Sequence, residues 1–573
     1  MSIQNVVIDH IDTWTTAKDQ KAKGGRGRGK KSNNQSQYGV KKLRELILDL
    51  AVHGKLVMQD PNDEPASVLL EKIATEKARL IKEGKIKKQK PLPEISEDEK
   101  PFGLPDGWYW TRLGEVTTYG ITEKSECNDA NENTWILELE DVEKSTSKLL
   151  NKVRVAERPF RSSKNIFLKN DVIYGKLRPY LDKVIIADEV GVCSSEMIPI
   201  RGYFGIVPAY LRLVLKSPYF KFYANNFTHG MNLPRLGTEK ARLALFPFVS
   251  DFMQYRIVSK VDELMALCDK LEQEQTDNDE THLLLVKTLL DTLTNAKDHK
   301  DFIESWWQIE HNFDILFTTE ESIDVLKQTI LQLAVMGKLV PQDPNDEPAS
   351  VLLKKIALEK ARLVNEGKIK KQKPLPEISE DEKPFELPKC WQYIRLGEAI
   401  NLISGQHLKP AEYSETQDQT MIPYLTGPAE FGLENPIPTR FTLEKRAFAE
   451  NGDVLITCKG SGVGKLNIAD TQIAISRQLM SMQPMVITTQ YLFLMGDSLY
   501  NNIRSKIVGI AIPGISREDV LEAIIGLPPI AEQQRIVAKV SNLYSICDSL
   551  RVRLNVAQTT QVQLADAVVK SVT

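Results

Sequence analysis

The chain has 573 residues and a formal net charge of −3; 42% of the residues are hydrophobic and 26% are charged. This length exceeds one hydrophobic core and predicts about three or four domain-sized units of ordinary globular composition. No apolar run approaches the roughly 18 residues of a membrane span, and residues 1–17 lack the apolar core of a signal peptide. We therefore expect a cytoplasmic protein without membrane contact, and any surface for nucleic acid must be local or completed by a basic partner.

The cysteines are scattered and form no C-x-x-C pair. They are Cys127, Cys193, Cys268, Cys390, Cys458 and Cys547. Zinc sites and disulfide frameworks both depend on patterned spacing. The sequence thus predicts reduced, structural thiols and no metal site.

Residues 18–36 contain the run AKGGRGRGKKSNNQS. Its glycine and serine residues give flexibility, and its adjacent cations repel one another, so we expect a disordered loop. Two interpretations remain open for it: a solvated linker, or a basic arm that touches phosphates.

A long internal repeat follows. Residues 43–115 match residues 326–398 without a gap at about 57 of 73 positions, and the shared text includes QDPNDEPASVLL and EGKIKKQKPLPEISEDEKPF. The period of about 283 residues is too long for a solenoid. The chain therefore consists of two related halves, a pseudo-twofold internal repeat. Weaker matches, such as residues 254–261 with 533–540, continue in the same order.

Each copy of the repeat predicts a helix followed by an extended linker. Residues 67–83 and 350–366 begin with serine, show apolar periodicity and end before Gly84 and Gly367. The following run, KIKKQKPLPEISEDEKPF, is interrupted by proline and should cross the surface in extended form.

The segments between the repeats, residues 108–250 and 391–531, resemble each other only in outline. Asp171–Tyr174 and Asp453–Ile456 look like matching strands, and each segment fits an α+β domain. Near-identical frames that hold divergent inserts are expected where one scaffold carries two different binding faces.

Residues 256–293 and 535–572 predict long helices. In the second, apolar residues recur at alternating spacings of four and three from Ile536 to Val568, which is the seam of a coiled coil. Roughly 36 residues of helix span about 55 Å. The two helices most simply pack on each other as an antiparallel coiled coil; the alternative is that each packs on its own domain.

These patterns divide the chain into five parts. They are residues 1–107, a helical region with the basic loop; 108–250, a first α+β domain; 251–390, a central region with a long helix and the second repeat; 391–530, a second α+β domain; and 531–573, a C-terminal helix.

The chain resembles the specificity subunits of type I restriction-modification systems, in the subfamily with extended repeats. The motifs that carry the resemblance are LPDGW at residues 104–108 with RLGE at 112–115, LPKCW at 387–391 with RLGE at 395–398, and LPPIAEQQRIV at 527–537. The first copy departs at Leu245–Phe248, which lacks the second proline of the exit motif. The resemblance covers almost the whole chain.

Family membership implies two target recognition domains that each read one half of a bipartite, asymmetric site in double-stranded DNA. It also implies two methyltransferase subunits, which methylate adenine at N6 with S-adenosylmethionine, and restriction/translocase subunits that use ATP and Mg²⁺. The chain itself would then be non-catalytic and bind no cofactor. Alternatives are a stand-alone DNA-binding or anti-restriction protein, and a protein-interaction scaffold.

The residues agree with a chain that has no catalytic centre of its own. The Asn/Asp-Pro-Pro-aromatic tetrad of a base methyltransferase is absent. Gly460–Lys465 fails as a phosphate loop, because Lys459 stands at the first glycine and Leu466 follows the lysine. The acidic run at residues 97–100 recurs at 380–383 beside proline, which favours a solvated linker over a nuclease site.

Candidate DNA contacts cluster after the predicted strands. Lys and Arg suit phosphates or guanine, Glu accepts from cytosine, and Gln pairs with adenine. The candidates in the first segment are Tyr174, Lys176, Arg178, Ser195, Glu196, Asn232 and Arg235, and those in the second are Lys459, Ser461, Lys465, Arg477 and Gln478.

Overall fold

The computed structural model describes residues 3–18, 37–60, 62–86, 88–126, 130–297, 299–460, 462–506 and 514–572. It separates into two units: unit 1 contains Met1–Asp279 and Val556–Thr573, and unit 2 contains Glu280–Asn555. Each unit holds one copy of the repeat and one divergent segment. The finer division into five parts stays a prediction. Among the described helices, none is long and apolar enough to cross a membrane.

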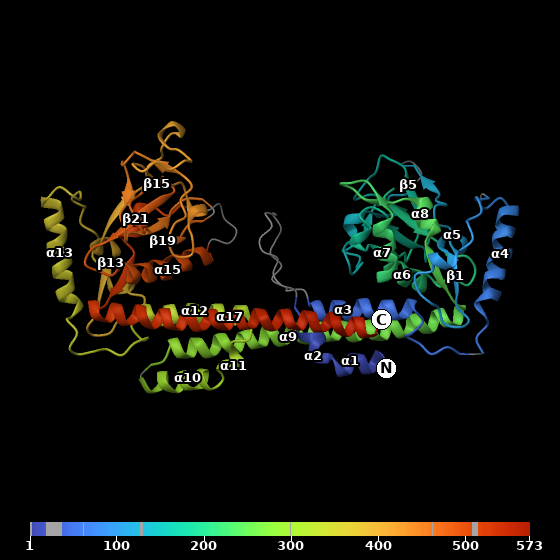
Figure 1. The fold of residues 1–573 in the computed structure, drawn as a ribbon, viewed down its shortest axis with the longest axis horizontal. Coiled ribbons are helices and arrows are strands. Elements are labelled where there is room, and N and C mark those ends of the chain that lie inside the picture. The colour runs from blue at the N-terminus through green and yellow to red at the C-terminus, as the bar shows by residue number, and fades with distance from the viewer. Residues whose placement is uncertain are drawn as a thin grey trace. The chain divides into compact units, whose positions relative to one another are not determined.

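The helices of unit 1 belong mostly to the repeat and to the second half of its divergent segment. They are α1 (Ile3–Asp9), α2 (Ile11–Thr16), α3 (Tyr38–Val52), α4 (Ala66–Lys82), α5 (Leu113–Val116), α6 (Pro208–Lys216), α7 (Pro218–Asn226) and α8 (Thr238–Leu243). Helix α4 stands beside β1 and α5 (Figure 1), and Lys77 on α4 donates to the Gly114 carbonyl of α5 at 3.4 Å.

The strands of unit 1 form small sheets of two, three and five strands. They are β1 (Tyr109–Arg112), β2 (Lys124–Ser125), β3 (Trp135–Leu137), β4 (Val153–Arg154), β5 (Lys164–Phe167), β6 (Val172–Gly175), β7 (Val184–Ile186), β8 (Gly191–Cys193), β9 (Met197–Ile200), β10 (Thr228–His229), β11 (Arg235–Leu236) and β12 (Leu245–Phe248). The sheet orders are β2-β5-β8-β3-β4, β7-β6-β9, β10-β11 and β1-β12. The pair β3–β8 is parallel and the other pairs are antiparallel.

Unit 2 repeats this plan with two four-stranded sheets, β14-β21-β18-β19 and β16-β15-β20-β17, and the pair β13-β22. Its strands are β13 (Gln392–Arg395), β14 (Ile400–Ser404), β15 (Ile422–Leu425), β16 (Phe441–Thr442), β17 (Phe448–Ala449), β18 (Val454–Thr457), β19 (Leu466–Ile468), β20 (Ile473–Ile475), β21 (Leu479–Pro484) and β22 (Ile524–Leu527). Its helices are α10 (His299–His311), α11 (Phe313–Leu316), α12 (Glu320–Val335), α13 (Ala349–Asn365), α14 (Leu396–Ala399), α15 (Thr489–Lys506) and α16 (Arg517–Leu521).

Strands β6 and β18 confirm the matched pair predicted from sequence. Each is central in its sheet, between β7 and β9 in unit 1 and between β19 and β21 in unit 2. All four residues of each strand are buried, so neither shows the alternation of a strand with one face in water.

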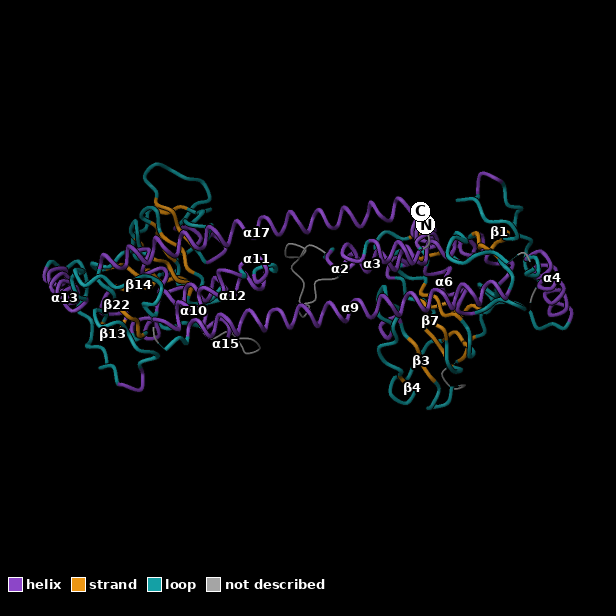
Figure 2. The backbone as a smooth tube through the Cα atoms, turned by 90° about the horizontal axis from the view of Figure 1, so that it is seen from below, coloured by secondary structure: helices purple, strands orange, loops and turns teal. Residues whose placement is uncertain are grey.

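Two long helices, α9 (Asp251–Thr294) and α17 (Ile530–Val572), run unbroken from one unit into the other in opposite chain directions (Figure 2). Both begin five residues earlier than the sequence predicts. In unit 1 the seam residues Ile257, Val261, Leu264, Cys268 and Leu271 of α9 are buried in the core that contains α3 and the end of α17.

Unit 2 shows the same packing with the helices exchanged. There Ile536, Val540 and Cys547 of α17 share a core with α12 and with the end of α9. In each unit a short helix, α3 or α12, therefore packs against the apolar seam of the long helices. Polar contacts agree: Arg44 on α3 pairs with Glu272 on α9 at 2.8 Å, and Lys327 on α12 pairs with Asp548 on α17 at 2.6 Å.

The helices predicted from Ser67 and Ser350 are present as α4 and α13, but the N-caps are Pro65 and Pro348, with no side-chain cap bond. The serines lie inside the first turn, so that part of the prediction is wrong. Cys193, Cys268, Cys390, Cys458 and Cys547 are free thiols, and Cys127 lies outside the described residues, as does most of the basic loop at residues 18–36.

Candidate nucleic-acid interface

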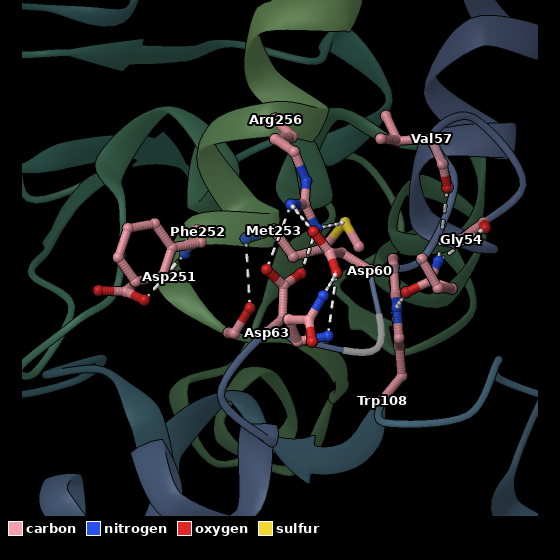
Figure 3. A network of polar contacts seen from close by, with 12 residues as sticks. Gly54, Val57, Asp60, Asp63, Trp108, Asp251, Phe252, Met253 and Arg256 are labelled. Carbon is pink, nitrogen blue, oxygen red and sulfur yellow. Dashed lines mark hydrogen bonds and ion pairs between the residues drawn. The ribbon is translucent and has the colours of Figure 1, made fainter.

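The LP-x-x-W motif of unit 1 packs onto the end of helix α3. Gly54 follows α3 with a φ of +69°, and a Cβ at this position would lie 2.5 Å from Pro105 Cγ and 3.1 Å from Trp108 Cζ2. Trp108 is 7% exposed, and its indole nitrogen donates to Gln59 at 2.8 Å. Glycine is required because only it combines a left-handed backbone with so close an approach. Figure 3 shows Gly54 and Trp108 beside this network.

The QDPNDEP run fixes the start of the long helix to this motif. The Asp60 carboxylate accepts from the Asn62 backbone at 2.9 Å, and Asp63 pairs with Arg256 of α9, with 3.2 Å between Nη1 and Oδ1 (Figure 3). Unit 2 has the equivalent pair, Arg535 Nη2 with Asp346 Oδ2, at 2.6 Å. We call these contacts of the two units the junctions.

The second motif, RLGE, contributes an arginine that joins four segments of each unit. Arg112 is 3% exposed; it donates to the carbonyls of Pro93 at 2.8 Å and Leu243 at 2.9 Å, and it pairs with Glu99. Arg395 makes the matching bonds to Pro376, Glu522 and Glu382. These arginines hold the linker of the repeat against the entrance strand of the divergent segment and against the residues just before its exit strand. Sequence reasoning missed this role; the signal was a cation at the same place in both halves.

Elsewhere in unit 1, three loops come together. We define loop cluster 1 as residues 176–180, 194–196 and 229–236. The Lys176 backbone donates to the Glu196 carbonyl at 3.0 Å, Arg178 donates to Pro234 at 2.7 Å, and Leu236 donates to Lys176 at 3.0 Å. The structure thus brings all the predicted DNA-contact residues of the first segment except Tyr174 together in loop cluster 1.

Loop cluster 2, residues 458–460, 476–478 and 514–515, repeats two of these bonds in unit 2. The Cys458 backbone donates to the Gln478 carbonyl at 2.8 Å, and Ile515 donates to the Cys458 carbonyl at 2.9 Å. The turns also match: Ser194 Oγ accepts from the Glu196 backbone at 3.3 Å, as Ser476 Oγ accepts from Gln478 at 3.2 Å. Position 195 therefore corresponds to 477, and 196 to 478.

The side chains of loop cluster 1 include one ion pair and two cations without one. Arg235 Nε lies 2.9 Å from Glu196 Oε2, and Nη2 lies 3.0 Å from Oε1, so the pair is bidentate. The bond to Glu196 raises the pKa of Arg235. Lys176 and Arg178 form no ion pair with a described residue. Arg178 is exposed, as are Ser195 and Asn232.

Tyr174 does not belong to this surface. It is 3% exposed, its ring meets Phe220 edge to face at 5.7 Å, and burial raises its pKa well above the usual range. Strand β6 is buried on both sides, so the side chain at its end packs into the core. The expectation of a DNA contact from Tyr174 is therefore wrong for this conformation.

Loop cluster 2 carries Lys459, Arg477 and Gln478 as exposed side chains, and the nearby Lys465 is also exposed. No described carboxylate pairs with these three cations. Ser461 lies outside the described residues. Strand β18 ends at Thr457 and its antiparallel neighbour β19 begins at Leu466, whereas a phosphate loop leads into a helix N-terminus.

Comparison with known proteins identifies the family. Residues 388–557 match the family model of the type I restriction modification DNA specificity domain. The specificity subunit of the type I restriction enzyme EcoAI from Escherichia coli is 38% identical over 596 residues, which cover 99% of each chain. The EcoEI specificity subunit of Escherichia coli is 38% identical over 601 residues, again covering 99% of each. The chain belongs to the family of type I restriction enzyme specificity subunits.

A solved structure agrees with the fold of this specificity subunit. A chain from a study of complex assembly and conformational transition in a type I restriction-modification system aligns with a TM-score of 0.53 at 20% identity, covering 82% of this chain and 99% of that one. The specificity subunit described here has the DNA-specificity role in such a system and is a non-catalytic component of it. The loop clusters are its candidate DNA interface.

Proposed function

We propose that this specificity subunit reads a bipartite, asymmetric DNA site, with loop cluster 1 on one half and loop cluster 2 on the other. The observation that carries the proposal is the pair of backbone hydrogen bonds that recurs in both clusters around different side chains. A backbone with matching hydrogen bonds presents Ser195 and Glu196 in one unit and Arg477 and Gln478 in the other. Because base edges are read by the donors and acceptors of side chains, the two clusters would prefer different bases.

The residues divide by the kind of contact they can make. Cations without an ion pair, such as half-buried Lys176 and exposed Lys459, are placed to neutralise phosphates, which fixes register without reading sequence. Arg477 and Gln478 suit guanine and adenine in the major groove. The Glu196–Arg235 pair presents a fixed carboxylate edge, whose remaining lone pairs can accept from cytosine. Arg178, Asn232 and Lys465 complete the proposed surface, and we exclude Tyr174.

We infer that α9 and α17 act together as an antiparallel coiled-coil spacer between the two half-sites. Helices of 44 and 43 residues are about 65 Å long. Adding one matched heptad to each should lengthen the spacer by about 10 Å, or about three base pairs. Sequencing of the methylated sites should show a longer non-specific spacer with both half-sites retained; an unchanged spacer would rule out this role.

The proposed partners are double-stranded DNA, two methyltransferase subunits that modify adenine at N6, and restriction/translocase subunits. S-adenosylmethionine, ATP and Mg²⁺ would be used by those subunits, and the cytoplasmic location stays a prediction. Each long helix offers apolar side chains to a partner: Leu284 and Leu285 of α9, and Val552 and Val556 of α17, are at least half exposed. Apolar exposure of this kind on a helix is typical of protein interfaces.

A genome-wide map of N6-methyladenine tests the proposal. Cells that contain the chain and its methyltransferase should carry a split methylated motif that disappears when the chain is deleted. Replacing residues 108–249 with the corresponding segment of a relative should change one half of the motif and leave the other intact. If both halves changed together, the assignment of one half-site to each unit would be wrong. Duplex binding without any associated methylation would instead indicate a stand-alone DNA-binding protein.

A further inference from the structure

The tip of the β10–β11 hairpin in loop cluster 1 carries two exposed apolar side chains. Met231 is 100% exposed and Leu233 is 43% exposed. Neither belongs to the buried core of unit 1. Apolar atoms at the surface are common, but a fully exposed methionine at the end of a projecting hairpin has no packing role in the free chain.

The hairpin beneath this tip is held firmly. Thr228 pairs with Leu236 and His229 with Arg235, and a further bridge joins Arg235 to Leu177 after β6. The bidentate bond between the side chains of Arg235 and Glu196 also holds strand β11 in place. The base of the hairpin is therefore tied by backbone and side-chain bonds to two other loops of the cluster.

The turn itself is tight. Gly230 has a φ of +95°, and a Cβ at this position would lie 3.0 Å from the Leu233 carbonyl oxygen. Pro234 at the other end of the turn restricts its own φ, and its carbonyl accepts from the Arg178 backbone at 2.7 Å. The backbone on both sides of Met231 is thus held before any partner binds, which lowers the entropy lost on insertion.

The surroundings of the tip favour a polyanion over an apolar protein groove. Arg178 is exposed, Lys176 is half-buried, and neither pairs with a described carboxylate. Burying Met231 against a protein would place both cations beside that interface without partners. A DNA duplex supplies phosphates for the cations and, between its base pairs, an apolar space for the side chain.

We propose that Met231 is a wedge that inserts between adjacent base pairs of the half-site read by unit 1 and unstacks that step. Leu233 packs beside it against the exposed base face. Because unstacking is easiest at pyrimidine–purine steps, the wedge adds a preference at a position that no hydrogen bond reads. The inference rests on the proposed DNA-reading function and extends it to base-step geometry.

The test uses the complex of the full chain with its methyltransferase and duplexes that carry the mapped site. In each duplex of a series, 2-aminopurine replaces one base of the half-site read by unit 1, and the position of the replacement moves along that half-site. The methylated adenine is left out of this scan, because a base taken out of the stack by the methyltransferase also fluoresces. The insert exchange shows which half-site belongs to unit 1.

Wild-type complex should raise the fluorescence at one step of this half-site, and Met231→Gln, which keeps the length but not the apolar character, should abolish the rise. Met231→Ala should also abolish it and weaken binding about tenfold, whereas Met231→Leu should retain it. Met58→Ala is the matched control, because Met58 is 92% exposed in the same unit and lies outside the loop cluster.

Each outcome separates the wedge from the wider function. Tight binding without a rise at any scanned step, or a rise that Met231→Gln leaves unchanged, would overturn the wedge and leave the DNA-reading function in place. Failure of the wild-type complex to bind the mapped duplex would overturn the proposed function itself.

Discussion

The junctions of the two units are alike in backbone and differ in one buried side chain. In unit 1 the motif tryptophan, Trp108, donates to the neutral amide of Gln59 at 2.8 Å. In unit 2, Trp391 donates at 2.9 Å to the carboxylate of Glu532, which also accepts from Gln342 at 2.7 Å. Met253 occupies the place of Glu532 in unit 1. A repeated frame can thus keep its geometry while the electrostatics at its centre change.

The loop clusters show the same principle at the surface. Their backbone bonds coincide, but cluster 1 contains the Glu196–Arg235 pair, and the described part of cluster 2 presents cations and Gln478 without a carboxylate partner. Ser195 in unit 1 occupies the backbone position that Arg477 occupies in unit 2. We conclude that the frame sets where side chains are presented and leaves their chemistry free. Each variant below tests one part of that separation.

The largest effect is expected at the glycine of each junction. Gly337→Ala should destabilise unit 2 by about 3–4 kcal/mol, because alanine is strained at a φ of +69°, and its Cβ would lie 2.6 Å from Pro388 Cγ. Gly54→Ala should cost the same in unit 1. Differential scanning calorimetry of the full chain measures both. Gly367→Ala is the control, since its φ is +70° with no atom within 4 Å, and it should cost about 1 kcal/mol. Equal losses at 337 and 367 would contradict the packing argument.

The second effect separates the two tryptophans. Trp391→Phe removes a donor from the buried carboxylate of Glu532 and should cost about 2–3 kcal/mol, the range for a hydrogen bond to a charged group. Trp108→Phe removes a donor from the neutral Gln59 and should cost about 1 kcal/mol from that bond. Both variants lose the same ring volume, so the cost of that loss cancels when the two changes in stability are compared. Hydrogen exchange, followed on peptides of each unit, reports the two costs separately; an equal cost would show that the acceptor's charge does not matter.

A third variant addresses the surface chemistry. Arg477→Ala should weaken binding to the mapped duplex by about 1–3 kcal/mol and relax one base position, if Arg477 pairs with guanine. The matched variant Ser195→Ala, at the same backbone position in unit 1, should have a smaller effect. Titrations at several salt concentrations distinguish the contact types. Uniform weakening on all sequences, with the salt slope reduced by about one, would assign Arg477 to a phosphate instead.

Sequence alone predicted the long helices and the strands β6 and β18. It succeeded there because the long helices carry an apolar period of four and three, and each strand is a short apolar run at a matching place in the two halves. It failed where tertiary packing decides. Tyr174 ends a strand that is buried on both faces, so no alternation marks its side chain as internal. The four-segment role of Arg112 depends on segments up to 131 residues away, which no local pattern reveals.

The smallest effect concerns pH. Burial raises the pKa of Glu532, against the lowering effect of its bonds from Trp391 and Gln342 and of nearby Arg535; Asp346 adds to the rise. A carboxyl whose pKa is higher in the folded state than in the unfolded state contributes stability that is fully present below the unfolded pKa and is lost as pH rises through the folded pKa. Unit 2 of the wild type should therefore lose this stability as the pH rises from about 4.5 upward.

Glu532→Gln should remove that part of the pH dependence in unit 2, because the amide keeps an acceptor for Trp391 and does not ionise. Unit 1 provides an internal control, since Met253 at the corresponding position has no titrating group. Its exchange rates should show the same pH dependence in both proteins, after correction for intrinsic exchange. If the protection of α17's first turns changed with pH equally in the wild type and in the variant, the buried carboxylate would not be the group that titrates. The difference between the junctions would then be one of hydrogen bonding alone.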